Sequence, residues 1–216
     1  RNWVYLCHAS QIPSTGDYVA TFLGRQPVFV IRRDDGDVGV FIDACTHRGA
    51  RLTQARYGKA GRLVCRYHSW TFDTRGRCIG VMAEQTGWPG GLDRTRYDLT
   101  PVARVGVHRG FVFASLSADV PELAEHLGES RAFLDIACEP TPTELEVVGS
   151  PVSYVMRANW KLAQENSADS YHAATVHRNY GRAITRQVEQ GGRAVTGGRF
   201  MLKQKLESGT FDLGRG

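Results

Sequence analysis

The sequence contains no long apolar stretch, no internal repeat and no low-complexity segment. Its uninterrupted apolar runs, such as residues 28–31, are only a few residues long and far too short to cross a bilayer, so no membrane-spanning segment is expected. Lysine is scarce, because 23 of the 27 Lys and Arg residues are Arg, and no nucleic-acid-binding motif accompanies this basic excess. No signal peptide is visible, and from the start at Arg1 we expect a fragment or a trimmed chain.

Cysteine is also sparse, with five residues among 216. Two of them belong to the motif described next, which leaves Cys7, Cys78 and Cys138, an odd number without the spacing of a disulfide framework. We therefore expect free thiols and a reducing, cytoplasmic location rather than a secreted, disulfide-built domain. The formal net charge of +5 is scattered along the chain, which is typical of a solvated, salt-bridged surface.

Two short pairs of cysteine and histidine stand out in the first third of the chain. One residue separates Cys45 from His47, 17 residues follow, and two residues separate Cys65 from His68. A Rieske-type [2Fe–2S] cluster is held by two thiolates on one iron and two imidazoles on the other. A loop with one ligand of each kind reaches both irons, so the pattern predicts a Rieske-type cluster bound by these four side chains.

Two alternatives fit these pairs less well. A structural zinc site also uses Cys and His, but it usually pairs Cys with Cys and His with His, and a one-residue gap is cramped for two ligands of one ion. Buried core cysteines with unligated histidines are the second alternative. The mixed order of both pairs favours the cluster.

Short β-like runs alternate with turn residues through the first half of the sequence. The predicted strands, rich in β-branched and aromatic residues, are 18–23, 28–32, 38–42, 63–64, 70–72, 78–81, 103–107 and 111–116. Gly-containing turns between several of them indicate hairpins. Many short strands with regular turns predict a small antiparallel β domain that carries the cluster at its tip.

The pattern changes after the last of these strands. Residues 121–127 and 131–137 are expected to form short amphipathic helices, and the Pro-rich residues 139–143 to form a linker. We place the domain boundary there, with a cluster domain at 1–138 and a second domain at 139–216. In the second domain, a strand is expected at 145–156, and Asn159 is expected to be the N-cap of a helix.

Asp169, His172 and His177 form the second candidate site. On a regular helix, Asp169 and His172 would lie about 60° apart on one face, whereas His177 would lie about 140° from His172. Joint metal binding by both histidines therefore requires a kink or a helix end near residues 174–176. Two histidines and a carboxylate form the facial triad of non-haem Fe(II) oxygenases. A solvated surface helix is the alternative, but a cluster that passes single electrons needs an acceptor, which favours the iron site.

Together the two constellations resemble the α subunit of Rieske non-haem iron aromatic ring-hydroxylating oxygenases. The resemblance rests on Cys45-x-His47, Cys65-x-x-His68 and the segment NWKLAQENSADSYHAATVH at 159–177. Within that family, the segments RNWVYLCHASQIPSTGDY, QPVFVIRR and YHAATVHRNY are similar to the benzoate/toluate dioxygenase branch. The similarity extends to about Tyr180. It implies an α+β fold, with an antiparallel β Rieske domain followed by the start of a helix-on-antiparallel-sheet catalytic domain.

The resemblance also implies a role for each matching residue. The implied ligands are Cys45, His47, Cys65 and His68 for the cluster, and His172 and His177 for a mononuclear Fe(II). Asp169 is implied to bridge two subunits, hydrogen-bonded to His68 of one α subunit and to His172 of its neighbour. The family's third iron ligand is a carboxylate far downstream. None of the remaining acids, Glu189, Glu207 and Asp212, has a matching context, so the third ligand is expected outside this chain.

The function implied by the resemblance is that of a terminal oxygenase component. Electrons from NADH would arrive through a separate flavin/iron–sulfur reductase, and O₂ would be used for cis-dihydroxylation of an aromatic carboxylate such as benzoate. The implied assembly is an α trimer, or α3β3 with a small β subunit. A Rieske-type electron carrier without its own catalysis, and a Rieske monooxygenase or demethylase, are the alternatives.

Overall fold

The computed structural model describes residues 2–138, 145–149, 152, 155–169 and 171–190. The chain divides into two compact units, residues 1–149 and 150–216, and each is considered by itself. No described helix is long and apolar enough to cross a membrane.

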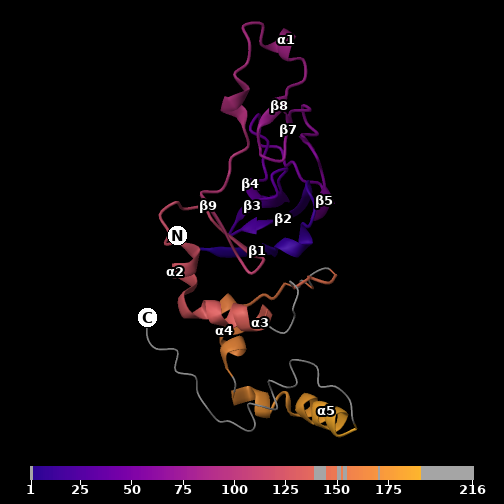
Figure 1. The fold of residues 1–216 in the computed structure, drawn as a ribbon, viewed down its shortest axis with the longest axis vertical. Helices are drawn as coiled ribbons and strands as arrows, with labels where there is room; N and C mark the ends of the chain where they lie inside the picture. The colour runs from indigo at the N-terminus through magenta and orange to yellow at the C-terminus, as the bar shows by residue number, and fades with distance from the viewer. Residues whose placement is uncertain (1, 139–144, 150–151, 153–154, 170, 191–216) are drawn as a thin grey trace. The chain divides into compact units, whose positions relative to one another are not determined.

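Three antiparallel sheets form the first unit (Figure 1). One has the order β1 (Val4–His8), β10 (Phe111–Ser115), β9 (Arg104–His108), and a second the order β4 (Val38–Ile42), β3 (Gln26–Arg32), β2 (Asp17–Leu23), β5 (Tyr57–Lys59). The third is β6 (Leu63–Val64), β7 (Thr71–Phe72), β8 (Cys78–Gly80). Helices α1 (Glu84–Gly87), α2 (Leu123–Leu127) and α3 (Arg131–Cys138) and the short 3-10 helices η1 (Ala9–Gln11), η2 (Arg94–Tyr97) and η3 (Gly128–Ser130) complete it.

The central strand β3 explains how one apolar run supports two hydrophobic cores. Successive side chains of a strand point to opposite faces. Phe29 and Ile31 accordingly enter the core that also contains Cys45 and Cys65, while Val28 and Val30 enter a second core beneath β1 and β10. All four β3 side chains are fully buried. The run at 28–31 is therefore the middle layer of the first unit.

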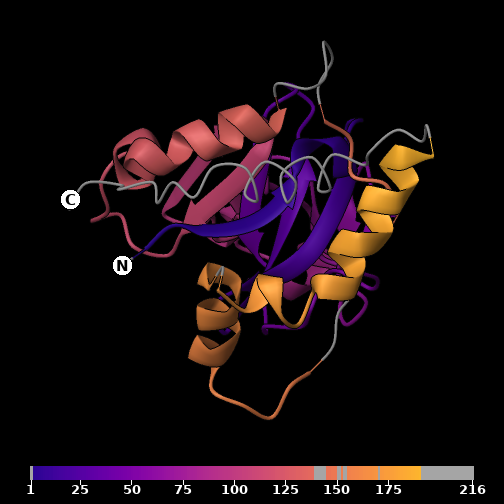
Figure 2. The ribbon, with the colours of Figure 1, turned by 90° about the horizontal axis from the view of Figure 1, so that it is seen from below.

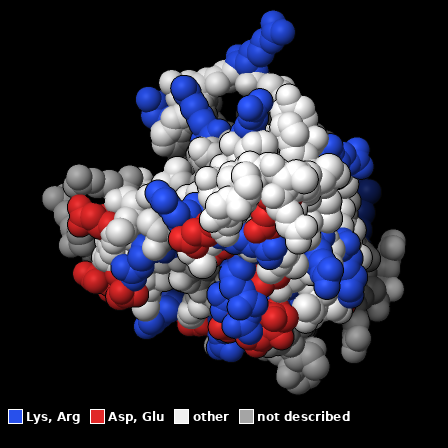
Figure 3. Space-filling model, turned by 90° about the horizontal axis from the view of Figure 1, so that it is seen from above, with Lys and Arg blue, Asp and Glu red and all other residues white. Residues whose placement is uncertain are grey.

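Ion pairs join the hairpin tips of two different sheets. The Arg75 Nε lies 2.6 Å from Asp34 Oδ1, which connects the β7–β8 turn to the β3–β4 turn. In the same place, the Asp34 N–H donates to Thr74 Oγ1 at 3.2 Å, and Arg33 pairs with Asp35 and Asp37. Seen from above, Lys and Arg side chains intermix with Asp and Glu on the surface (Figure 3). The Arg75–Asp34 ion pair and the Asp34–Thr74 hydrogen bond therefore link the small β6–β8 sheet to the larger one.

The second unit contains helices α4 (Trp160–Ala168) and α5 (Arg178–Glu189), with the short 3-10 helix η4 (Tyr171–Ala174) between them in sequence (Figure 2). The predicted N-cap is confirmed, because Asn159 Oδ1 accepts the Lys161 N–H at 3.1 Å. The predicted strand at 145–156 is wrong for the residues described there, which have no strand geometry. A strand requires a hydrogen-bonding partner, and none of the described strands pairs with this segment.

The eight strands and two helices predicted in the first unit are confirmed, with ends that shift by at most two residues. The sequence interpretation missed β1, β5 and α1. Strand β5 is only three residues long and has Gly58 at its centre, so it has neither the length nor the composition of a strand signal. The predicted fold class, an antiparallel β domain followed by part of an α+β catalytic domain, is confirmed.

Two turn glycines offer a matched test of packing beneath the β7–β8 hairpin. Gly76 (φ +83°) and Gly36 (φ +86°) are both left-handed, but a Cβ at Gly76 would lie 2.5 Å from the Phe41 ring, whereas one at Gly36 meets nothing within 4 Å. Gly36→Ala should cost about 1 kcal/mol of unfolding free energy from backbone strain alone. Gly76→Ala should cost about 1–3 kcal/mol more because the core is overpacked. Urea denaturation measures both, and equal losses would contradict the packing described here.

Candidate metal centres

The first Cys–His pair lies on a tight loop directly after β4. The Cys45 N–H donates to the Ala50 carbonyl, and the Gly49 N–H donates to the Cys45 carbonyl, both at 2.8 Å. Gly49 has a φ of +73°, in the left-handed region that glycine adopts without strain. The loop is therefore closed at its cysteine by residues four and five positions further on.

The second pair lies between β6 and β7 on a loop with the same two hydrogen bonds. The Cys65 N–H donates to the Trp70 carbonyl, and the Ser69 N–H donates to the Cys65 carbonyl, again at 2.8 Å. Ser69 has a φ of +56° and occupies the position that glycine holds in the first loop. The backbone strain at a non-glycine residue there costs roughly 1–2 kcal/mol. The two loops thus present their ligands from one repeated backbone frame.

These loops bring two thiols and two imidazoles together. Cys45 and Cys65 are both buried, and the His47 and His68 ring centroids are 4.6 Å apart in an edge-on arrangement. Burial, with a smaller contribution from the Cys65 thiol, raises the pKa of Cys45 to about 11. A neutral thiol is therefore the stable form at Cys45 until a metal displaces its proton.

His47 provides the observation that tests whether these residues fit an iron–sulfur cluster. Its Nδ1 atom is buried and has no hydrogen-bond partner among the described residues. A buried polar atom without a partner costs roughly 1–3 kcal/mol, unless a bound group takes the partner's place. Burial, followed by the charges of His68 and Arg48, lowers the pKa of His47 and favours the neutral imidazole that binds metal. The donor set therefore fits a cluster with two thiolate and two imidazole ligands.

The arrangement does not fit the alternative of one tetrahedral zinc ion. Among the described residues, no three His, Cys, Asp or Glu side chains gather around a single point as ligands of one ion. A structural zinc site needs four such groups at one centre, whereas a Rieske cluster takes two on each of two separated irons. The convergence of two pairs, and not of four groups on one point, favours the cluster.

A buried aspartate that the sequence interpretation missed holds the base of the first loop. Asp43 Oδ1 accepts the N–H groups of Leu52 and Thr53, both at 3.0 Å, and Oδ2 accepts the Thr53 hydroxyl. Arg51 Nε donates to the same Oδ2 at 2.8 Å, and the Asp43 side chain has no exposed surface. Asp43 therefore ties the chain entering the loop to the chain leaving it. In the sequence, Asp43 could have been noticed only as a single acidic residue among the apolar residues that precede Cys45.

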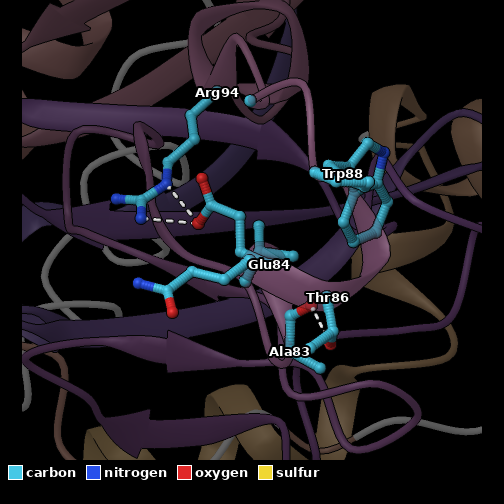
Figure 4. Close-up of a pocket in the computed structure, with 9 residues that line it drawn as sticks. Ala83, Glu84, Thr86, Trp88 and Arg94 are labelled. Atoms are coloured by element: carbon cyan, nitrogen blue, oxygen red, sulfur yellow. Dashed lines mark hydrogen bonds and ion pairs between the residues drawn. The ribbon is translucent and has the colours of Figure 1, made fainter.

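An open cavity of about 690 Å³ lies in the long segment after β8, lined by residues of α1 and by Trp88 and Arg94 (Figure 4). Arg94 donates from Nε and Nη2 to Glu84 Oε2 at 2.9 and 2.6 Å, and from Nη1 to the Ile79 carbonyl at 3.1 Å. The positive charge of Arg94 is thus paired with the Glu84 carboxylate within the protein. On the core side, Trp88 packs edge-on against Trp70, with ring centroids 6.0 Å apart.

The second predicted site is also assembled within its own unit. His172 Nδ1 lies 2.8 Å from Asp169 Oδ2, and the His172 and His177 ring centroids are 5.2 Å apart. Hydrogen bonds from His172 and from the Tyr171 N–H lower the pKa of Asp169, so the carboxylate is charged at neutral pH. The Nδ1 of His172 then carries the proton, and its Nε2 lone pair is left to bind a metal.

The geometry corrects one expectation for this site and confirms another. Asp169 is not on a continuous helix with His172, because it ends α4 with extended backbone angles (φ −78°, ψ 113°). Its carboxylate oxygens instead accept the N–H groups of Tyr171 and His172 at 2.7 and 3.4 Å. The predicted break before His177 is confirmed, since η4 ends at Ala174 and α5 begins only at Arg178.

Comparison with known proteins identifies both parts of the chain. Residues 2–98 match the Rieske [2Fe-2S] domain family, and residues 143–207 match the ring-hydroxylating alpha subunit (catalytic domain) family. The chain therefore belongs to the α subunits of Rieske ring-hydroxylating oxygenases, as its motifs indicated.

Individual proteins of known name are similar to this chain over most of its length. The chain is 45% identical to the toluate 1,2-dioxygenase subunit alpha of Pseudomonas putida over 86% of its own length and 41% of that relative. It is 41% identical to the 2-halobenzoate 1,2-dioxygenase large subunit of Burkholderia cepacia, over 87% of this chain and 41% of the relative. The structure matches naphthalene 1,2-dioxygenase from Rhodococcus sp. bound to indole with a TM-score of 0.78 and 33% identity, over 88% of this chain and 42% of that one. The chain thus spans about two fifths of the length of these relatives.

Removal of the Asp43 carboxylate should loosen the first ligand loop. Asp43→Ala leaves the Leu52 and Thr53 donors buried without a partner and should reduce the free energy of unfolding by about 3–5 kcal/mol. Iron retained per chain after gel filtration should fall as well. Asp37→Ala is the control, since the Asp37 side chain is 78% exposed and its ion pair with Arg33 is solvated. If Asp43→Ala were as stable and as iron-rich as the control, the clamp assigned to Asp43 would be wrong.

Proposed function

We propose that Cys45 and Cys65 hold one iron of a Rieske [2Fe–2S] cluster and that His47 and His68 hold the other. The observation that carries the proposal is the convergence of two buried thiols and two imidazoles on loops with matching hydrogen bonds. The unpartnered Nδ1 of His47 supports the same ligand set. The cluster domain is assigned to residues 1–138 and the start of the catalytic domain to residues 139–216.

His172 and His177 are proposed as two ligands of a mononuclear Fe(II), with the third, a carboxylate, supplied from outside this chain. When bound, the iron provides open coordination positions for O₂. Asp169 fixes the His172 ring through the Nδ1 hydrogen bond of 2.8 Å, so Nε2 is directed to the metal. The ring contact of His172 with His177 supports a shared site.

Asp169 is further proposed to connect the two metal sites between neighbouring subunits. Each carboxylate oxygen can accept about two hydrogen bonds, so the bonds from Tyr171 and His172 leave capacity for another donor. The Asp169 side chain is 46% exposed, which leaves it accessible to His68 of an adjacent α subunit. The proposed assembly in which neighbouring subunits meet in this way is an α trimer, alone or as α3β3 with a small β subunit.

The complete subunit is proposed to be the terminal oxygenase component of an aromatic-carboxylate dioxygenase. Its electrons come from NADH through a separate flavin/iron–sulfur reductase, and its product is the cis-dihydrodiol of an aromatic acid such as benzoate. The names of the toluate and 2-halobenzoate 1,2-dioxygenase relatives support this substrate class. The thiols of Cys7, Cys45, Cys65 and Cys78 form no disulfide in the described structure, which agrees with the proposed cytoplasmic location.

Two buried cysteines give a matched test of the cluster ligands. Cys45→Ser should abolish the iron and acid-labile sulfide bound by the chain, since a serine hydroxyl is a poor substitute for a thiolate. Cys7→Ser removes an equally buried thiol from the core beneath β1 and β10. It should leave the bound iron and the acid-labile sulfide at the level of the parent protein. Metal analysis that found full iron in Cys45→Ser would reject this residue as a ligand.

Asp169→Ala in the complete oxygenase tests the proposed bridge. Substrate-coupled O₂ consumption should stop, because the connection between His68 and His172 is lost, while the visible spectrum of the cluster should remain unchanged. Asp37→Ala serves as the control with a full rate of turnover. Normal coupled turnover by Asp169→Ala would show that electrons do not depend on this carboxylate.

A further inference from the structure

The His47 ring lies flat on the indole of Trp70. Their centroids are 4.7 Å apart and their planes differ by only 2°. Trp70 is 2% exposed, so it seals one face of the imidazole from water. The other ring packed against His47 is that of His68, which meets it edge-on. The orientation of the His47 ring is therefore set mainly by its contact with the indole.

The indole is itself held from two further sides. Trp88 and Tyr97 pack edge-on against Trp70, with centroids 6.0 and 5.0 Å away. The Tyr97 carbonyl accepts the Thr46 hydroxyl at 2.6 Å, which brings the same support to the residue preceding His47. These contacts support the indole in its position against the imidazole.

Trp70 also connects the two ligand loops. Its backbone carbonyl accepts the Cys65 N–H and closes the second loop, while its side chain supports the histidine of the first. In the described part of the chain, the aromatic neighbour of His68 other than His47 is Tyr67, which is 63% exposed and so shelters His68 less from water. The two imidazoles therefore differ, since His47 rests on a dry, rigid surface and His68 lies beneath a solvent-facing ring.

We propose that Trp70 is a positioning residue that fixes the His47 imidazole, keeps water from its buried face and thereby holds down the reduction potential of the cluster. The proposal rests on the ligand set assigned under the proposed function. Reduction adds one negative charge to the centre, and water stabilises that charge better than an indole face does. Loss of the indole should accordingly raise the midpoint potential.

The test compares three variants of the cluster-loaded protein by redox titration and by electron paramagnetic resonance of the reduced state. Trp70→Leu should raise the midpoint potential and change the g-values, because the His47 ring is no longer held in one orientation. Trp70→Phe keeps an aromatic face, so its midpoint potential and g-values should lie between those of Trp70→Leu and those of the parent protein. Trp3→Leu is the control, since Trp3 is a buried tryptophan remote from both ligand loops in the fold and should retain the parent potential and g-values.

The outcomes separate this inference from the function on which it rests. A parent protein without a Rieske signal would overturn the proposed function itself. A parent with that signal, but with an unchanged potential and g-values in both Trp70 variants, would overturn only the role of Trp70. If Trp70→Leu binds no cluster, Trp70→Phe decides the question by the same two measurements. A shift in Trp3→Leu as large as that in Trp70→Phe would also refute the proposal, because it would be a general effect of core damage.

Discussion

The burial of the proposed ligand atoms, the thiols of Cys45 and Cys65 and the Nδ1 atom of His47, is the constraint on which the first unit depends. The thiols of Cys45 and Cys65 and the Nδ1 atom of His47 are removed from water, and Nδ1 is left without a hydrogen bond in the described structure. In a metal-free protein this arrangement costs free energy. Folding can maintain it only if the surrounding chain holds the two loops firmly, and the bound cluster then recovers the cost.

Four features of the surrounding chain hold the two loops in place. The apolar run of β3 sends alternate side chains into two cores and so anchors the middle of the unit. Asp43 fastens both ends of the first loop, and the ion pair between Arg75 and Asp34 joins the hairpin tips of two sheets. Trp70 adds a direct link between the loops. Each of these features holds a different part of the first unit, and together they fix the two loops that carry the proposed ligands.

Sequence patterns predicted most of the framework because short β-branched runs and glycine-containing turns are local signals. The spacing of Cys45, His47, Cys65 and His68 predicted a cluster because the chemistry of two mixed pairs has few other uses. Asp43 was not found from the sequence, since its function depends on donors eight to ten residues away that only the folded loop brings to it. The stacking of Trp70 on His47 likewise spans two loops that the sequence shows only as separate segments.

The second unit shows the limit of periodicity arguments. Helical spacing placed Asp169 and His172 on one face, but α4 ends at Ala168, and the pair meets through a turn in which Asp169 accepts backbone N–H groups. Asp residues are common where a helix ends, because their side chains accept hydrogen bonds from nearby backbone N–H groups in competition with the helix. The strand predicted at 145–156 is absent from the described residues of that segment for a different reason, since β-propensity is realised only where a partner strand exists.

The central claim, that this chain binds a Rieske cluster through two thiolates and two imidazoles, is tested most directly by one set of measurements. Iron and acid-labile sulfide per chain should be determined together with the electron paramagnetic resonance spectrum after dithionite reduction. The account predicts a low-average-g Rieske signal with two cluster irons per chain, and a third iron only where the missing carboxylate ligand is present. Zinc in place of iron, with no such signal, would contradict it.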